Sequence, residues 1–233
     1  MSARRLVLAS AALLAAGCAH APQKDYTKFV AAQPRSILVV PVVNRAISVN
    51  ASDFFLSTVP IPLAERGYYV FPVNLVKRLL EDEGLADPGL VHSADPTRLA
   101  SLFGADAVLY ITIERWDAKY VLISTSVTVE FSYVLKDGKT GTTIWEDHET
   151  MQYASDSGGG GLLGAMINAA ITKASPNYMP LARQANARAL SYPGPGLPAG
   201  PYRPDEYKRD VFIPLVGPAP TAPAEPAKEP AAR

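Results

Sequence analysis

The only cysteine of the chain, Cys18, has the setting of a thiol that is chemically modified. It follows a basic start, with Arg4 and Arg5, and an apolar run of 11 residues from Leu6 to Ala16. Such a run is too short to span a bilayer, which needs about 20 apolar residues, but it is typical of a secretory signal. A lone thiol forms no internal disulfide and invites intermolecular oxidation outside the cytoplasm. Acylation of the sulfur removes that difficulty.

The residues before Cys18 resemble the lipobox of bacterial lipoproteins, in which small side chains let a signal peptidase cut before the cysteine. The recognition residues here are Leu14, Ala15, Ala16 and Gly17. The leucine stands one position earlier than in the commoner pattern. The resemblance implies diacylglycerol on the Cys18 sulfur and an acyl chain on its new N-terminus. Cleavage at an A-x-A-like site without lipidation is the alternative. Ala19, in place of Asp, implies the outer membrane, with the domain facing the periplasm.

A histidine flanked by carboxylates lies in the string WEDHE. On a strand, Glu146 and His148 share one face, while Asp147 and Glu149 lie on the other. A carboxylate beside a histidine can act in general acid–base catalysis. A solvated polar strand face produces the same pattern, and we favour that interpretation.

Metal and nucleotide motifs are incomplete. The other histidines, His20 and His92, fall in a tether and in a Gly/Pro-rich loop, and neither H-E-x-x-H nor a cysteine pair is present. Gly138-Lys139-Thr140 lacks the earlier glycine of a phosphate-binding loop and predicts a hairpin turn. Gly159-x-Gly161-x-x-Gly164 lacks the acidic residue expected about 20 positions on. We therefore expect no catalytic residue, metal, small-molecule substrate or cofactor beyond the Cys18 lipid.

Charge gives the chain no affinity for polyanions. Removing residues 1–17 leaves 216 of the 233 residues, with 20 basic and 22 acidic side chains, a formal charge of −2. Nucleic-acid binding and a polybasic membrane patch both need a basic excess. No second long apolar run is present, so the lipid is the one membrane attachment that we expect.

Composition divides the chain into five parts. We predict a signal peptide over 1–17, a flexible tether over 18–34, a periplasmic domain over 35–192, an extended Pro/Gly-containing segment over 193–216 and a disordered Pro/Ala tail over 217–233. In the extended segment, the aromatic side chains of residues 202–215 could pack on the domain or on a partner.

The first half of the domain alternates strands with helices. The apolar string SILVVPVV at Ser36–Val43 predicts a strand buried on both faces. A helix over 52–66 must restart at its prolines and end at Gly67. After a strand at Tyr68–Pro72, Asn74 is expected to cap a second helix. A third helix opens at the cap Asp95-Pro96 and ends at Gly104.

The second half is a meander. We predict strands at Ala107–Trp116, Tyr120–Leu135 and Thr142–Tyr153, with a short connection at Asp117–Lys119 and a turn over 137–141. Apolar residues at odd positions of the middle strand predict one buried and one wet face. Helices then follow to about Leu190. The order β-α-β-α-β-β-β-α predicts an α/β (α+β) fold, a single two-layer domain with a mixed sheet whose first three strands are parallel.

A glycine-rich segment at 158–171 has the composition of a partner contact. Four consecutive glycines are costly to hold rigid and suit a loop that moves or admits another backbone. The apolar residues beyond them form one face, for which core packing is the alternative. The candidate contact residues are Gly158, Gly159, Leu162, Leu163, Met166 and Ile167.

Five strings in order, ILVVPVVN, RGYYVFPVN, FGADAVLYITIERW, LKDGKTGTTIW and GPYRPDEYKRD, resemble a family of uncharacterised bacterial lipoproteins over residues 18–212. The domain also resembles the curli-secretion channel subunit, the N-terminal domain of the Tol-system propeller protein and the lipoprotein activators of penicillin-binding proteins. These resemblances imply a binding module, with no catalytic residue to carry over. The curli channel has long insertions that build its pore, and the short connection at Asp117–Lys119 makes a pore unexpected here.

Three function classes follow. We favour a non-enzymatic outer-membrane lipoprotein that binds other envelope lipoproteins, or a curli-channel-like subunit, in an assembly or secretion complex. An activator of a peptidoglycan synthase is the first alternative. A hydrolase or nucleotide-binding enzyme is the second, and a concave pocket with converging titratable groups would favour it.

Overall fold

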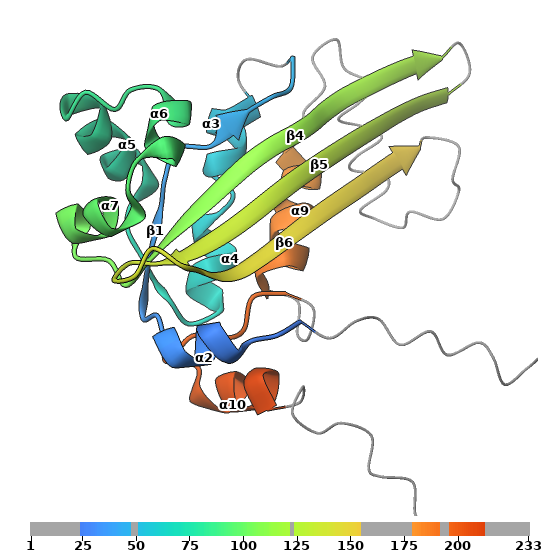
Figure 1. Cartoon of the computed structure of the whole chain (residues 1–233). Coiled ribbons are helices and arrows are strands. Elements are labelled where there is room, and N and C mark those ends of the chain that lie inside the picture. The colour runs from blue at the N-terminus through green and yellow to red at the C-terminus, as the bar shows by residue number, and fades with distance from the viewer. Residues whose placement is uncertain (1–23, 48–50, 122–123, 155–178, 192–195, 213–233) are drawn as a thin grey trace, which may run out of the picture.

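One mixed sheet organises the chain (Figure 1). A computed structural model describes residues 24–47, 51–121, 124–154, 179–191 and 196–212. The strand order is β3-β1-β4-β5-β6, with β2 paired to β4. Strands β1, β2 and β3 run parallel to their neighbours, and β4, β5 and β6 form an antiparallel meander. The expected α/β class is therefore confirmed. The strands are β1 Ser36–Val39, β2 Val43–Asn44, β3 Tyr69–Val70, β4 Ala107–Val121, β5 Ser124–Asp137 and β6 Thr143–Ala154.

The first expected strand is broken in two. Ile37, Leu38 and Val39 of β1 are fully buried, as a central parallel strand requires. Pro41 has no N–H to give to a ladder, so regular pairing stops before it. Pairing resumes at β2, opposite Thr112 and Ile113 of β4.

The helices of the first half follow their local signals, with two exceptions. The chain restarts as a helix at Pro60, and Gly67 adopts a φ of 87°. Asn74 is not the N-cap. The helix begins at Val73, with Pro72 as its N-cap, so Asn74 lies inside the first turn. His92 does not lie in a loop but in a short helix that Asp87 caps. The helices are α3 Ala51–Leu56, α4 Pro60–Glu65, α5 Val73–Asp82, α6 Pro88–Ser93 and α7 Pro96–Phe103.

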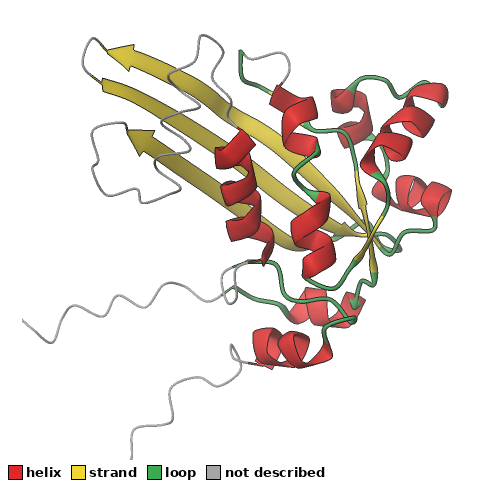
Figure 2. Cartoon of the chain, turned by 180° about the vertical axis from the view of Figure 1, so that it is seen from behind, coloured by secondary structure: helices red, strands yellow, loops and turns green. Residues whose placement is uncertain are grey.

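Helices lie on both faces of the sheet where its strands are parallel (Figures 1 and 2). A small core beneath α5, α6 and α7 contains Leu38, Leu80 and Val108. The larger core lies on the other face, beneath α3, α4 and α9 (Met179–Ser191). There the rings of Phe55 and Phe131 lie 4.4 Å apart between centroids.

Strands β4, β5 and β6 extend beyond this double-covered region as a long ribbon (Figure 1). The expected alternation is confirmed at Val129, Phe131, Tyr133 and Leu135, which are all fully buried. The connection that we expected at Asp117–Lys119 is wrong: these residues continue β4, paired to β5, and the strands are joined at 122–123.

Both terminal segments pack on the domain. Residues 24–34, here called the N-terminal segment, contain α2 (Thr27–Ala32) and bury Phe29 completely, so this stretch of the expected tether is folded. Residues 196–212, here called the C-terminal strap, run extended and then form α10 (Pro204–Phe212). The strap approaches so closely that a Cβ on Gly200 would lie 2.2 Å from the carbonyl oxygen of Gly67.

A buried arginine holds the strap. Arg66, 4% exposed, donates to the carbonyl of Leu197 at 3.1 Å, to Glu206 at 3.2 Å and to Asp210 at 2.5 Å. Asp210 also accepts from the backbone N–H of Ala199 at 3.0 Å. A planar guanidinium suits this task because its five donors lie in a fixed fork.

Candidate partner-binding site at the sheet edge

The outermost strand β6 pairs with β5 on one side, and no described strand pairs with its other edge, although α2 contacts the strand. The carbonyl of Glu146 accepts from Nζ of Lys24 at 3.3 Å, so it points away from β5. Because backbone groups alternate in direction along an antiparallel strand, those of His148 and Thr150 point outward as well.

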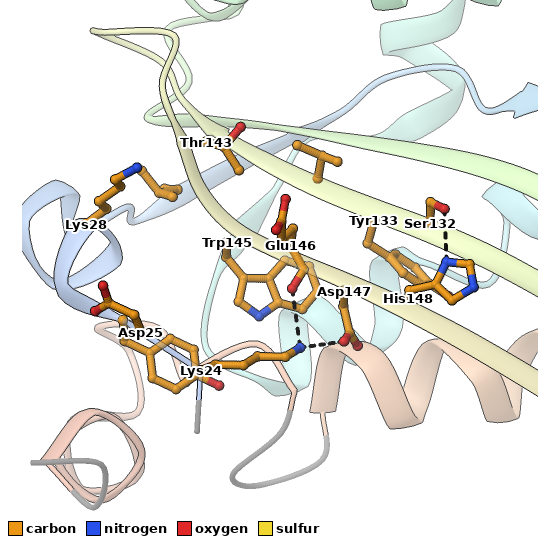
Figure 3. A pocket seen from close by; sticks show the side chains of 13 residues that line it. Lys24, Asp25, Lys28, Ser132, Tyr133, Thr143, Trp145, Glu146, Asp147 and His148 are labelled. Atoms are coloured by element: carbon orange, nitrogen blue, oxygen red, sulfur yellow. Dashed lines mark hydrogen bonds and ion pairs between the residues drawn. The ribbon is translucent and has the colours of Figure 1, made fainter. Parts of the chain in front are cut away.

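A cavity of about 890 Å³ lies over this edge. Its walls come from the N-terminal segment, from β5 around Tyr133 and from residues 143–148 of β6 (Figure 3). Lysines, carboxylates, a histidine and a tryptophan line it together, so the surface offers both charges and an aromatic ring. Such a mixture suits recognition of a polypeptide better than that of a small apolar ligand.

Lys24 reaches into the cavity and makes three contacts with β6 (Figure 3). Its ammonium forms an ion pair with Asp147, donates to the Glu146 carbonyl and lies 5.2 Å from the centroid of the Trp145 ring. The Asp147 side chain is 12% exposed. The indole Nε1 of Trp145 is buried and has no hydrogen-bond partner among the described residues.

Tyr26 joins the two terminal segments beside this cavity. Burial, and then the nearby Asp147 carboxylate, raises the pKa of Tyr26 to about 12. The phenol therefore keeps its proton at neutral pH and donates it to the carbonyl of Gly196 in the strap at 2.9 Å.

The helix-free face of the ribbon carries a charged network. His148 lies 3.2 Å from the Ser132 hydroxyl through Nδ1 and 3.0 Å from Glu130 through Nε2. Serine, histidine and carboxylate in series is the arrangement of a hydrolytic triad. Here, however, the Ser132 hydroxyl also lies 3.2 Å from the Glu114 carboxylate, to which it can donate. Glu114 and His148 are therefore both within hydrogen-bond reach of the same hydroxyl.

The strand-face prediction for the WEDHE string is confirmed, with different partners. Glu146 and His148 lie opposite Val134 and Ser132, on the helix-free face. The carboxylate that reaches His148 comes from Glu130 on the neighbouring strand. On the other face, Glu149 pairs with Arg188 of α9 at 3.2 Å, and burial raises the pKa of Glu149.

His92, the other described histidine, is structural. Its Nε2 lies 3.0 Å from the carbonyl of Pro41, and its ring meets that of Tyr110 edge-on. Burial lowers the pKa of His92 and raises that of Tyr110 to about 12. Both groups are therefore neutral at pH 7.

The remaining motifs have simple outcomes. Gly138-Lys139-Thr140 is a hairpin turn, as predicted. Within it, the backbone N–H and the hydroxyl of Thr140 donate to the Asp137 carboxylate. Cys18 with its recognition residues 14–17 and the glycine-rich candidates at 158–167 lie outside the described residues. Within the described ranges, no group of three potential ligands for a metal ion occurs.

Sequence reasoning missed Lys24 and Trp145. The available signal was a tryptophan on a strand otherwise rich in carboxylates. A large aromatic ring at such a position is expected to be packed against another segment of the chain. Nothing local identified Lys24 as that cover, since the two residues lie far apart in the chain.

Comparisons with known proteins place the chain in a family. Residues 24–202 match the family described as "Putative lipoprotein GNA1162-like". A lipoprotein of Neisseria meningitidis serogroup B is 36% identical over 171 residues, which cover 72% of this chain and 80% of that protein.

Two solved structures are also similar. The crystal structure of lipoprotein GNA1162 from Neisseria meningitidis has 34% identity and a TM-score of 0.52, covering 59% of this chain and 96% of that one. The PelC dodecamer from Paraburkholderia phytofirmans has 17% identity and a TM-score of 0.45, covering 68% and 86%.

No helix in the described part of the chain has the length and apolar character to cross a membrane. The chain belongs to the GNA1162-like family of lipoproteins.

Proposed function

We propose that this lipoprotein is a non-enzymatic component of an envelope assembly or secretion complex and binds a partner protein through the outer edge of β6. The observation that carries the proposal is the outward-directed backbone at Glu146, beside a cavity of about 890 Å³. A partner strand laid along this edge would gain main-chain hydrogen bonds, and the cavity would select its side chains.

The edge is long and protected. Natural proteins guard exposed strand edges with charges, because an unguarded edge pairs with any other chain. Lys24, Asp147 and Glu149 provide such charges here, and the first two lie directly on the cavity. An edge that is guarded yet left open over a cavity supports selective rather than general strand pairing.

A lipid on Cys18 would tether the domain close to its start. Cys18 precedes Lys24 by six positions, and six residues span at most about 20 Å when extended. The backbone of Lys24, whose side chain contacts β6, would then lie within about 20 Å of the lipidated residue. We propose the outer membrane, because Ala19 follows the cysteine, and we propose other membrane-bound envelope proteins as the partners.

The histidine network supports binding rather than catalysis. A nucleophilic serine must give its proton to histidine, and here Glu114 competes with His148 for the Ser132 proton, at 3.2 Å in each case. Arg45 and Arg115 pair with Glu114 and Glu130, at 2.8 Å and 3.7 Å. The charged side chains of this sheet face thus form ion pairs with one another.

Photo-crosslinking in intact cells tests the proposal. A benzophenone amino acid replaces Thr150, which is exposed on β6, and Glu81, which is also exposed but on the distant helix α5, serves as the control site. We expect a discrete product from position 150 and none from position 81. Equal products from both sites, or none from position 150, would contradict the proposal.

The identity of the product separates the two binding functions. A lipoprotein of an assembly or secretion complex supports the function proposed here, and a peptidoglycan synthase supports the activator alternative. Cys18→Ser should abolish the product and move the protein away from the outer-membrane fraction. Normal processing and fractionation of Cys18→Ser would show that lipid on this residue is not the anchor.

A further inference from the structure

We infer that the Lys24 side chain is a displaceable cover on the β6 edge, and that the partner carries a basic side chain on an extended segment that takes its place. This inference rests on the proposed function and names the chemistry of the partner. The cover contacts Asp147, the carbonyl of Glu146 and the ring of Trp145.

Lys24 and an added strand compete for the same backbone group. The Glu146 carbonyl is the acceptor that a strand paired with β6 would use, and Nζ of Lys24 already occupies it at 3.3 Å. A carbonyl oxygen can accept two hydrogen bonds, but the ammonium already lies on its outward side, where an added strand would approach. Departure of Lys24 would therefore favour strand addition along this part of the edge.

The departing charge must be replaced. Asp147 is 12% exposed, and a carboxylate so deeply placed is destabilising without a cationic partner. Trp145 offers the ring face that attracts ammonium and guanidinium groups. Its unpartnered Nε1 lies beneath the cover as a further donor for a carbonyl of the incoming segment. An arginine or lysine of the partner meets these demands, whereas a neutral or acidic residue does not.

The cover is weakly held compared with the rest of the N-terminal segment. The Lys24 side chain is 30% exposed, so water screens its ammonium and weakens its ion pair relative to a fully buried one. By contrast, Phe29 is fully buried and Tyr26 is 6% exposed. Lys24 can therefore leave its site while α2 stays packed.

Two variants that break the same ion pair give opposite predictions. In the crosslinking assay at position 150, Lys24→Ala removes the cover and should raise the product yield about fivefold. Asp147→Asn also removes the cover's ion pair but takes away the partner's counter-charge, and should lower the yield at least as strongly. Lys77→Ala and Asp53→Asn break an exposed ion pair elsewhere and should leave the yield unchanged.

The outcomes distinguish failure of the proposed binding function from failure of the proposed role of Lys24. Absence of any product at position 150 in every variant overturns the proposed function itself. A product whose yield moves in the same direction in Lys24→Ala and Asp147→Asn overturns the cover alone. Mass spectrometry of the crosslinked peptide adds a readout that is independent of folding in the variants. A partner segment with no lysine or arginine, or a second copy of this chain, contradicts the inference.

Discussion

Two ion pairs fasten the two terminal segments, and they differ mainly in burial. Arg66 and Asp210 hold the C-terminal strap with side chains 4% and 3% exposed, whereas Lys24 and Asp147 are 30% and 12% exposed. Arg66 has three acceptors in a fixed arrangement, and breaking it leaves a buried charge. The ammonium of Lys24 is partly solvated, so another cation can take its place on Asp147. Burial thus fixes the strap to the domain more firmly than the Lys24 contact, in keeping with the displacement that we propose.

The largest expected effect comes from Arg66→Ala. Asp210, 3% exposed, would lose its buried cation and keep only the exposed Arg209 at 3.7 Å, so we expect the free energy of unfolding to fall by about 3–5 kcal/mol. Urea denaturation of the purified domain measures it. Arg203→Ala, which breaks the exposed pair with Glu206, is the control and should cost less than about 1 kcal/mol. Equal losses in the two variants would show that the strap is not locked by burial.

Gly200→Ala attacks the strap by steric clash. The new Cβ would lie 2.2 Å from the Gly67 carbonyl oxygen and 2.9 Å from the Tyr68 ring, so the strap must shift. We expect a loss of about 1–3 kcal/mol, typical of overpacking. Limited proteolysis should then cut within residues 196–212 faster than in the parent protein. Unchanged proteolysis and stability would mean that the strap lies farther from Gly67 than the structure places it.

Tyr26→Phe tests the joint between the two segments. It removes the hydrogen bond to the Gly196 carbonyl and should cost about 1 kcal/mol. If the Lys24 contact is independent of the strap, the effects of Tyr26→Phe and Lys24→Ala on unfolding free energy should add within about 0.5 kcal/mol. A larger deviation from additivity would show that the Lys24 contact and the strap stabilise each other, so that the two ion pairs could not be treated as independent.

Lys24→Ala should have the smallest effect on stability. A partly exposed pair contributes about 0–1 kcal/mol, so its thermal midpoint should nearly match that of Lys77→Ala, which breaks the exposed pair with Asp53. A loss above about 2 kcal/mol would make Lys24 a structural lock like Arg66, and the proposed displacement would then be too costly.

The local features of the fold were predictable because each depends on residues that are neighbours in sequence. Asp95 caps its helix and Gly104 ends it in the left-handed conformation, as the sequence predicts. The alternation in β5 correctly assigned its buried face, because side chains of a strand point to opposite sides in turn. The predicted connection at Asp117–Lys119 failed for the opposite reason. Polar residues favour a turn, but pairing with β5 keeps them in the strand.

By itself, the sequence predicted the main strands of the sheet, the ends of the helix from Pro96 to Phe103 and the buried face of β5. The lipid on Cys18 stays a prediction from the sequence. Only the tertiary structure brought Lys24 onto Trp145 and Asp147, and Arg66 onto Asp210, which is 144 positions away. Periodicity and capping follow from backbone geometry over one or two turns, so a single sequence displays them. A contact between distant charges depends on where whole segments pack, and that is decided by burial of apolar side chains such as Phe29.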